Sequence, residues 1–242
     1  MKPVLRFDHA GYSIAGRPIL RDLDLELYAG ETLVLLGRSG SGKTTALKLV
    51  NGLLMPTSGA VLVEERPTSS WDLIRLRRRI GYVIQEGGLF PHFTVERNVG
   101  LVPSLEGWEP SRIRARVYEL LTRLDLPPAQ FAARYPRRLS GGERQRAGIA
   151  RALAADPDIL LFDEPFGALD PITRAEARKQ FIHLRDTLRK TAIFVTHDVR
   201  EALRVGSRIA LLHQGCIEAL CPPGEFVRHP GAEVRAFLAS AE

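Results

Sequence analysis

The feature that most constrains the fold is a glycine-rich segment that follows a short apolar run. Residues 37–44 read Gly-Arg-Ser-Gly-Ser-Gly-Lys-Thr and fit the pattern G-x-x-x-x-G-K-[ST]. Residues 31–36 before them predict a buried strand, and residues 43–52 predict a helix. Glycines let a loop in this position turn its backbone N–H groups toward one point, and the helix N-terminus adds partial positive charge. The segment therefore predicts a phosphate-binding loop in an α/β fold.

The side chains of this loop suit a nucleotide with a bound metal ion. We expect Lys43 to reach the β- and γ-phosphates and the Thr44 hydroxyl to ligate Mg²⁺. The loop residues expected to bind the nucleotide are Gly37, Arg38, Ser39, Gly40, Ser41, Gly42, Lys43, Thr44 and Thr45.

A pair of carboxylates follows a second apolar run. Residues 159–162 predict a buried strand, and Asp163 and Glu164 come directly after it. We expect Asp163 to hold Mg²⁺ through its water shell, and Glu164 to accept a proton from the attacking water or to orient it. Asp-Glu pairs are common where a loop starts, so this expectation depends on the phosphate loop being present.

A second glycine motif lies at residues 139–146, which read Leu-Ser-Gly-Gly-Glu-Arg-Gln-Arg. A serine and two glycines at the start of a predicted helix form another anion-binding terminus. The sequence has one phosphate loop, so a second terminus of this kind suggests that a second copy of the chain takes part.

Taken in order, these motifs resemble those of the ATP-binding subunits of ABC transporters, over essentially the whole chain. The resemblance implies ATP and Mg²⁺ as the cofactors and Glu164 as the catalytic base. It implies that His197 contacts the γ-phosphate, and that Gln85 senses Mg²⁺ and links the core to a helical lobe. Further nucleotide contacts implied by the resemblance are Tyr12, which would stack on adenine, and Ser140, Gly141, Gly142, Gln145 and Asp170.

The resemblance also implies partners. Two copies are expected to pack head to tail, with each ATP between the phosphate loop of one copy and Ser140–Gly142 of the other. ATP binding would close the dimer and hydrolysis would reopen it. The motion would pass through the region of Gln85 to membrane-spanning permease subunits, which a solute-binding protein serves. The expected location is therefore cytoplasmic, peripheral on the inner face of the cell membrane.

The expected fold class is α/β, a P-loop NTPase core with an N-terminal antiparallel β subdomain and an inserted α-helical subdomain. We expect one ABC ATPase domain over residues 1–242, with its core in residues 1–85 and 157–242. Residues 86–156 would form the helical signature subdomain. The apolar period supports this division, because residues 23–27 alternate like a strand and residues 111–124 repeat like a helix capped by Ser111. Residues 17–20 are a weaker strand candidate, and residues 209–212 and 217–220 predict a terminal hairpin. A last helix is expected over residues 232–241.

Two stretches narrow the subfamily. Residues 80–95 and 194–203 are similar to those of importers of quaternary-amine osmoprotectants such as glycine betaine, choline and carnitine. Amino-acid, phosphonate and lipid-related transport stay open as alternatives, as does a single-cassette ATPase that serves no transporter. Many subunits of that subfamily continue into paired CBS domains, which we expect to be absent because the sequence ends at Glu242.

Composition excludes several other classes. No apolar run approaches the roughly 18–20 residues that span a bilayer, and the first residues do not read as a secretory signal. The cysteines, Cys216 and Cys221, are too few for a disulfide framework. The net charge of +6 is spread along the chain. We therefore expect no nucleic-acid partner.

Overall fold

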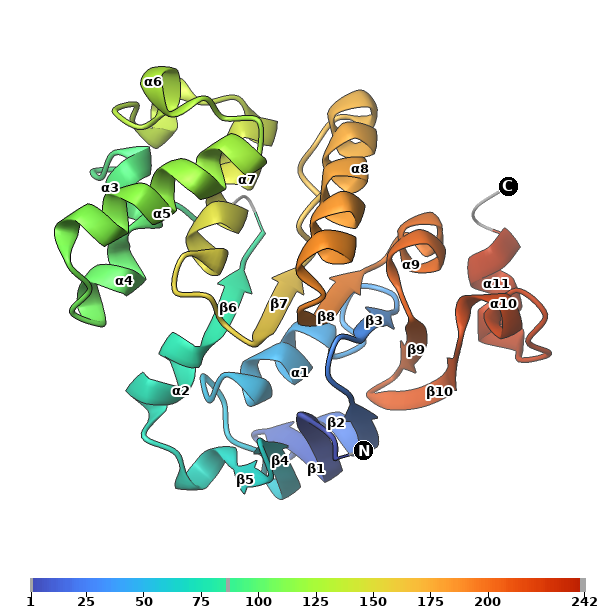
Figure 1. The fold of residues 1–242 in the computed structure, drawn as a ribbon. Coiled ribbons are helices and arrows are strands. Elements are labelled where there is room, and N and C mark those ends of the chain that lie inside the picture. Colours follow the sequence, from blue (N-terminus) through green and yellow to red (C-terminus); the bar gives the residue numbers. More distant parts are fainter. Residues whose placement is uncertain (1, 86–87, 240–242) are drawn as a thin grey trace. The chain divides into compact units, whose positions relative to one another are not determined.

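A computed structural model describes residues 2–85 and 88–239 of the chain (Figure 1). Contacts divide the chain into two compact units. The first unit comprises Met1–Arg77 together with Leu188–Glu242, and the second comprises Arg78–Thr187. The second unit is thus inserted into the sequence of the first. The predicted boundaries of the helical subdomain, at residues 86 and 156, stay a prediction.

An antiparallel sheet forms the N-terminal part of the first unit, as predicted. Its strands occur in the order β2-β1-β4-β5. Their bounds are Leu5–Ile14 for β1, Arg17–Leu27 for β2, Ser58–Val63 for β4 and Arg66–Pro67 for β5. Leu23, Leu25 and Leu27 are buried, which explains the alternating pattern of the sequence.

One strand was expected to be two. The sequence predicted separate short strands at residues 17–20 and 23–27, but β2 runs through both. Asp22 has a φ of 50°, and the register between β1 and β2 shifts on either side of Ala10, which pairs with Leu23. A local irregularity of this kind lets one strand absorb an extra residue and continue.

A second sheet of the first unit carries its parallel strands, in the order β10-β9-β3-β8. Strand β3 pairs in parallel with β8 and β9, and β9 and β10 form the predicted antiparallel hairpin. Every residue of β3 and β8 is buried, as expected for strands in the middle of an α/β core. The bounds are Thr32–Leu36 for β3, Thr191–Thr196 for β8, Arg208–His213 for β9 and Cys216–Cys221 for β10.

The helices of the first unit follow the strands that lead into them. Their bounds are Lys43–Val50 for α1, Val199–Val205 for α9, Pro223–Phe226 for α10 and Ala232–Ala239 for α11, with a short 3₁₀ turn at Thr68–Ser70. Helix α2, Leu73–Arg79, leads into the second unit. The end predicted for the last helix, at residue 241, lies outside the described residues.

The second unit combines a parallel strand pair with a run of helices. Strands β6, Ile80–Val83, and β7, Ile159–Asp163, pair in parallel. The inserted helices between them confirm the predicted change to helical structure. Their bounds are Val95–Val99 for α3, Leu101–Leu105 for α4, Pro110–Arg123 for α5, Pro128–Phe131 for α6 and Gly141–Leu153 for α7, with a 3₁₀ turn at Pro136–Arg138; α8, Pro171–Leu188, follows β7.

The predicted cap of helix α5 was wrong. Ser111 lies inside the helix, which begins at Pro110 with Glu109 as its N-cap residue. Proline suits the first helical position because its φ is already helical and its missing N–H would have no partner there. Among the described residues, the structure has no helix that is long and apolar enough to cross a membrane.

Candidate functional site

The predicted phosphate loop connects β3 to α1 in the first unit, and its glycines are required by its shape. Gly40 and Gly42 have φ values of 79° and 105°, which side chains of L-residues rarely allow. A methyl group on Gly42 would lie 2.5 Å from Leu20 Cδ2, and one on Gly37 would lie 2.5 Å from the Leu212 carbonyl oxygen. The loop therefore tolerates glycine alone at these positions.

The polar groups of the loop fit an anionic ligand. Lys43 is only 5% exposed, and its Nζ donates hydrogen bonds to the carbonyl oxygens of Gly37, at 2.8 Å, and Arg38, at 2.9 Å. The Ser41 hydroxyl is buried and has no hydrogen-bond partner within the described ranges. No side chain caps helix α1, whose N-cap residue is Gly42. The first N–H groups of the helix can therefore bind phosphate oxygens.

Tyr12 and His197 belong to the same unit as the loop. Tyr12 pairs with Leu20 across β1 and β2, and Leu20 is the residue that contacts Gly42. Leu36 and Thr196 are register partners in β3 and β8, so Gly37 and the exposed His197 leave the sheet at the same edge. The first unit thus contains three of the predicted features and places Gly37 and His197 at one edge of its sheet.

Hydrogen bonds fix the backbone on both sides of His197. The Thr196 hydroxyl donates to Glu201 Oε2 at 2.7 Å and accepts from the Asp198 N–H at 3.0 Å. The Asp198 carboxylate in turn caps α9 by accepting from the N–H groups of Arg200 and Glu201. Thr196 and Glu201 are absent from the predicted site residues, although both lie in the stretch at 194–203 that carries the family resemblance.

In the second unit, Asp163 is the last residue of β7 and is 8% exposed. Its Oδ2 accepts a hydrogen bond from the Tyr82 hydroxyl at 3.1 Å. Burial, and then the negative charge of Asp163, raise the pKa of Tyr82 far above its usual value, so the phenol keeps its proton and donates. Tyr82 is also absent from the predicted site residues; the pairing register of β6 with β7 is the signal that reveals it.

Glu164 and Gln85 point toward one place in this unit. Glu164 has a φ of 45°, a strained conformation of the kind that clusters at functional sites. A methyl group built on Gly167 would lie 3.6 Å from Glu164 Oε2 and 3.7 Å from Gln85 Nε2. Gln85 is exposed and follows the end of β6 by two residues.

Asp170 organises the start of helix α8. Its Oδ1 accepts hydrogen bonds from the N–H groups of Ile172 and Thr173, each at 3.1 Å. Hydrogen bonds from the Thr173 side chain and then from these backbone groups lower the pKa of Asp170. The Asp170 carboxylate is therefore ionised at neutral pH. Asp170 is also the last residue of the loop that follows Glu164.

The second glycine motif opens helix α7 with a capping box. Ser140 Oγ accepts from the Glu143 N–H at 3.3 Å, and the Ser140 N–H donates to Glu143 Oε2 at 2.6 Å. Packing also favours glycine at residue 142, because a methyl group there would lie 2.7 Å from Thr173 Cγ2. Gln145 is 2% exposed, and its Nε2 has no hydrogen-bond partner in the part of the chain that the structure describes.

The donors predicted for Mg²⁺ are oxygen atoms, which is the ligand type that this ion prefers. The Thr44 hydroxyl belongs to the first unit, and the Asp163 carboxylate and the Gln85 amide belong to the second. One carboxylate with a hydroxyl and an amide suits an ion that also binds substrate phosphates and water. Each of these donor types therefore suits Mg²⁺.

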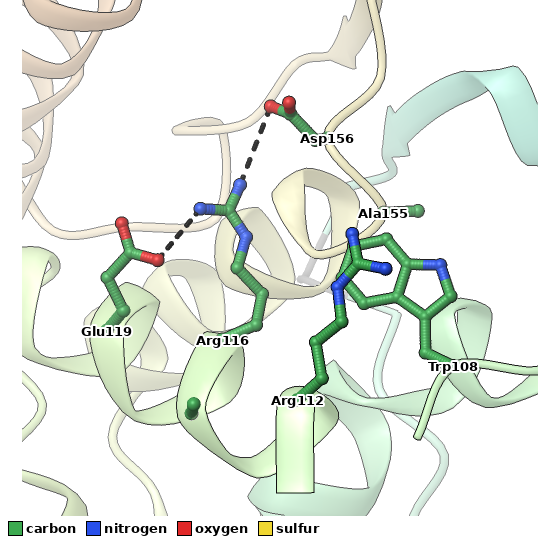
Figure 2. A pocket seen from close by; sticks show the side chains of 7 residues that line it. Trp108, Arg112, Arg116, Glu119, Ala155 and Asp156 are labelled. Carbon is green, nitrogen blue, oxygen red and sulfur yellow. Dashed lines mark hydrogen bonds and ion pairs between the residues drawn. The ribbon is translucent and has the colours of Figure 1, made fainter. Parts of the chain in front are cut away.

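A hollow elsewhere in the second unit holds none of the predicted residues (Figure 2). Arg116 lies between two carboxylates, 3.0 Å from Glu119 and 3.6 Å from Asp156. The Arg112 guanidinium stacks over the Trp108 ring at 3.7 Å. The charged groups around the hollow thus largely pair with one another. This indicates that they hold α5 against the end of α7.

Comparisons with known proteins agree with the motif order. Residues 20–167 match the family described as ABC transporter. The osmoprotectant import ATP-binding protein OsmV of Salmonella typhimurium is 46% identical over 90% of this chain, which spans 58% of OsmV. YehX of Escherichia coli, a glycine betaine uptake ATP-binding protein, is 40% identical over 99% of the chain and 78% of its own length.

Other relatives have different roles or known structures. The sulfate/thiosulfate import ATP-binding protein CysA of Pseudomonas aeruginosa is 43% identical over 88% of this chain and 65% of its own length. The cassette MJ0796, solved as a dimer bound to ADP and Pi, is 33% identical with a TM-score of 0.80. That likeness covers 90% of this chain and 98% of the other, and it confirms the predicted fold class.

Proposed function

The chain belongs to the ABC transporter family, and from that premise we propose that it binds and hydrolyses ATP to power an importer. The observation that carries the proposal is the phosphate loop. Gly40 and Gly42 hold left-handed conformations there, and Lys43 is buried within hydrogen-bond distance of the loop carbonyls. This arrangement suits the binding of phosphates.

Binding would use the loop and its neighbours. Lys43 would contact the β- and γ-phosphates, and the N–H groups at the start of α1 would bind phosphate oxygens. Tyr12 would stack on the adenine ring. Thr44, Asp163 and Gln85 would hold Mg²⁺, which, when bound, neutralises charge on the β- and γ-phosphates.

Hydrolysis would depend on Glu164 and His197. As a water oxygen bonds to the γ-phosphorus, the bond from phosphorus to the bridging oxygen of ADP breaks. Glu164 would accept the proton that the water loses, and His197 would contact the oxygens of the transferred phosphoryl group. The position of Glu164 directly after Asp163, the last residue of β7, supports this role.

A second copy would complete each site. We expect Ser140, Gly141, Gly142 and Gln145 of one copy to contact the ATP bound by the other, with Asp170 near the contact between copies. The dimeric structure of MJ0796 supports this arrangement.

Membrane-spanning permease subunits are the second kind of partner. Two large apolar side chains near Gln85 are exposed. Ile84, just before it, is 36% exposed, and Phe90, further along the chain, is 42% exposed. Exposed apolar groups that gather into a contiguous patch mark protein contacts, and the Phe90 ring lies against Phe93 with 5.5 Å between centroids. We therefore expect this region to dock on a permease, which would place the chain at the inner face of the membrane.

For the solute, the proposal is a quaternary-amine osmoprotectant such as glycine betaine, choline or carnitine. OsmV and YehX, which are named for such uptake, support it. CysA is nearly as similar, so sulfate and the other solute classes are alternatives that the test must separate.

The test has two stages. Purified chain with its permease in membrane vesicles should release phosphate from ATP, and Glu164→Gln should bind ATP as a dimer on gel filtration without hydrolysing it. Absence of both properties would refute the ATPase proposal. Vesicles with the full transporter should then accumulate glycine betaine, choline or carnitine; accumulation of sulfate instead would overturn the solute assignment alone.

A further inference from the structure

We infer that Tyr82 is a positioning residue, and that its hydroxyl fixes the carboxylate of Asp163 in the orientation that Mg²⁺ requires. The two side chains are joined by a 3.1 Å hydrogen bond in which the phenol donates to Oδ2. The inference rests on the proposed function, because the orientation of Asp163 matters only if the chain binds ATP with Mg²⁺.

The strand register explains why Tyr82 reaches Asp163. Strands β6 and β7 run in parallel, and Tyr82 is the register partner of Leu161. Side chains two residues apart share a face of a sheet, so Asp163 lies on the face of Tyr82, one step closer to the strand end. The long phenol side chain spans that step.

The hydrogen bond from Tyr82 acts on one defined oxygen of the Asp163 carboxylate. The terminal torsion of an aspartate is broad, so a hydrogen bond to Oδ2 narrows the orientations that the carboxylate adopts. Asp163 is 8% exposed, which limits the help that water can give. Mutating the outer-shell groups that orient a metal site, as Asp163 and Tyr82 would here, typically changes metal affinity by about 10–100-fold.

The strands around the pair are fixed by contacts that do not involve the hydroxyl. A methyl group on Gly81 would lie 2.5 Å from the Ala152 carbonyl oxygen, so β6 packs closely against α7. Next to Asp163, the Phe162 ring meets Phe181 edge to face, with 4.9 Å between centroids. Removing the Tyr82 hydroxyl should therefore leave the ring and both strands in place and act on the carboxylate.

The experiment uses Tyr82→Phe, with Tyr118→Phe as a matched control. Tyr118 is in the same unit, and its hydroxyl contacts the exposed Arg114. The full chain with its permease is assayed for ATP hydrolysis across Mg²⁺ concentrations. In parallel, Glu164→Gln chains saturated with ATP are titrated with Mn²⁺, followed by EPR of the bound ion, and ATP binding is measured in EDTA.

For Tyr82→Phe we expect the half-saturating concentrations of Mg²⁺ and Mn²⁺ to rise about tenfold. The turnover at saturating Mg²⁺, ATP binding in EDTA and the thermal unfolding midpoint should stay close to those of the Tyr118→Phe chain. A lower midpoint with unchanged metal dependence would mean that the hydroxyl is only structural, and would overturn the inference.

A further pair of variants separates this inference from the proposed function. If Asp163→Asn abolishes metal binding while Tyr82→Phe does not alter it, the inference about Tyr82 fails and the proposed function stands. If Asp163→Asn and Glu164→Gln both leave hydrolysis and Mn²⁺ binding intact, the proposed function itself fails.

Discussion

The two units of the chain build their parts of the proposed site by different physical means. In the first unit the backbone forms the site, through the positive φ angles at Gly40 and Gly42 and a helix that starts without a side-chain cap. In the second unit, side-chain hydrogen bonds and one strained residue position the carboxylates of Asp163 and Glu164. The spacing of glycines in the sequence encodes a site built from backbone groups. A site built from side chains depends instead on strands that meet only after folding.

The largest expected effect tests the side-chain half. Glu164→Gln keeps the size of the side chain but cannot accept a proton, so ATP hydrolysis should fall by about 10²–10⁴-fold. ATP binding should persist, as measured by equilibrium dialysis. Glu119→Gln, which changes a carboxylate that pairs with Arg116, should hydrolyse ATP normally. Equal rates for the two variants would remove Glu164 from the mechanism.

The backbone half is tested by adding a methyl group. Gly42→Ala should destabilise the chain by about 3 kcal/mol, because it combines an unfavourable φ with a contact at 2.5 Å to Leu20 Cδ2. Gly16→Ala has a similar φ of 77° and nothing within 4 Å, so it should cost about 1 kcal/mol. Urea denaturation measures both values. If they agree, close packing contributes nothing to the choice of glycine at residue 42.

A smaller effect is expected at Thr196, where the first unit also uses a side chain. Thr196→Val removes the acceptor of the Asp198 N–H and the donor to Glu201, so kcat should fall about tenfold with stability lower by about 1–3 kcal/mol. Thr196→Ser keeps the hydroxyl and should restore the rate.

Thr191→Val is the matched control for this prediction. Thr191 is also buried in β8, and its hydroxyl accepts from the Gly30 N–H. Its loss should lower stability by a similar amount while leaving kcat unchanged. A drop in kcat for both variants would mean that β8 stability, rather than the backbone at His197, limits turnover.

The smallest effect is expected where the phosphate loop meets the last helix. Arg38 is 3.4 Å from Glu233 of α11, and the Arg38 side chain is 65% exposed while that of Glu233 is 28% exposed and also lies 3.5 Å from His213. Because water screens exposed ion pairs, Glu233→Gln should change the free energy of unfolding by no more than about 0.5–1 kcal/mol, read from urea denaturation. A larger loss would indicate that α11 supports the phosphate loop. The conformation of the loop would then depend on a side-chain contact as well as on its glycines.

Local pattern was enough to predict much of this chain. The phosphate loop, the alternation at Leu23, Leu25 and Leu27, and the terminal hairpin all follow from residues close together in sequence. The family was recognised because its motifs occur in a fixed order. The roles of the site residues stay predictions, including those of Gln85, His197 and Asp170.

What the sequence could not supply depends on contacts between distant segments. The hydrogen bond from Tyr82 to Asp163 requires the parallel register of β6 with β7, which no local pattern encodes. Likewise, the sequence explains Gly142 by ligand binding alone, whereas in the structure a methyl group there would also meet Thr173 of α8. The errors at Ser111 and in β2 had local causes. The helix begins at a proline rather than at a serine cap, and an irregular strand departs from the simple alternating pattern.

The capping box at Ser140 limits which sequences could replace it. Helix capping alone would accept serine, threonine, asparagine or aspartate. The Ser140 oxygen already accepts from the Glu143 N–H, and a hydroxyl still has a proton to donate. Aspartate would cap the helix equally well but would repel a phosphate and offer it no donor. If the proposed contact with ATP exists, variant libraries at this position should separate folding from activity: several residues would give a folded chain, and only hydroxyl residues an active one.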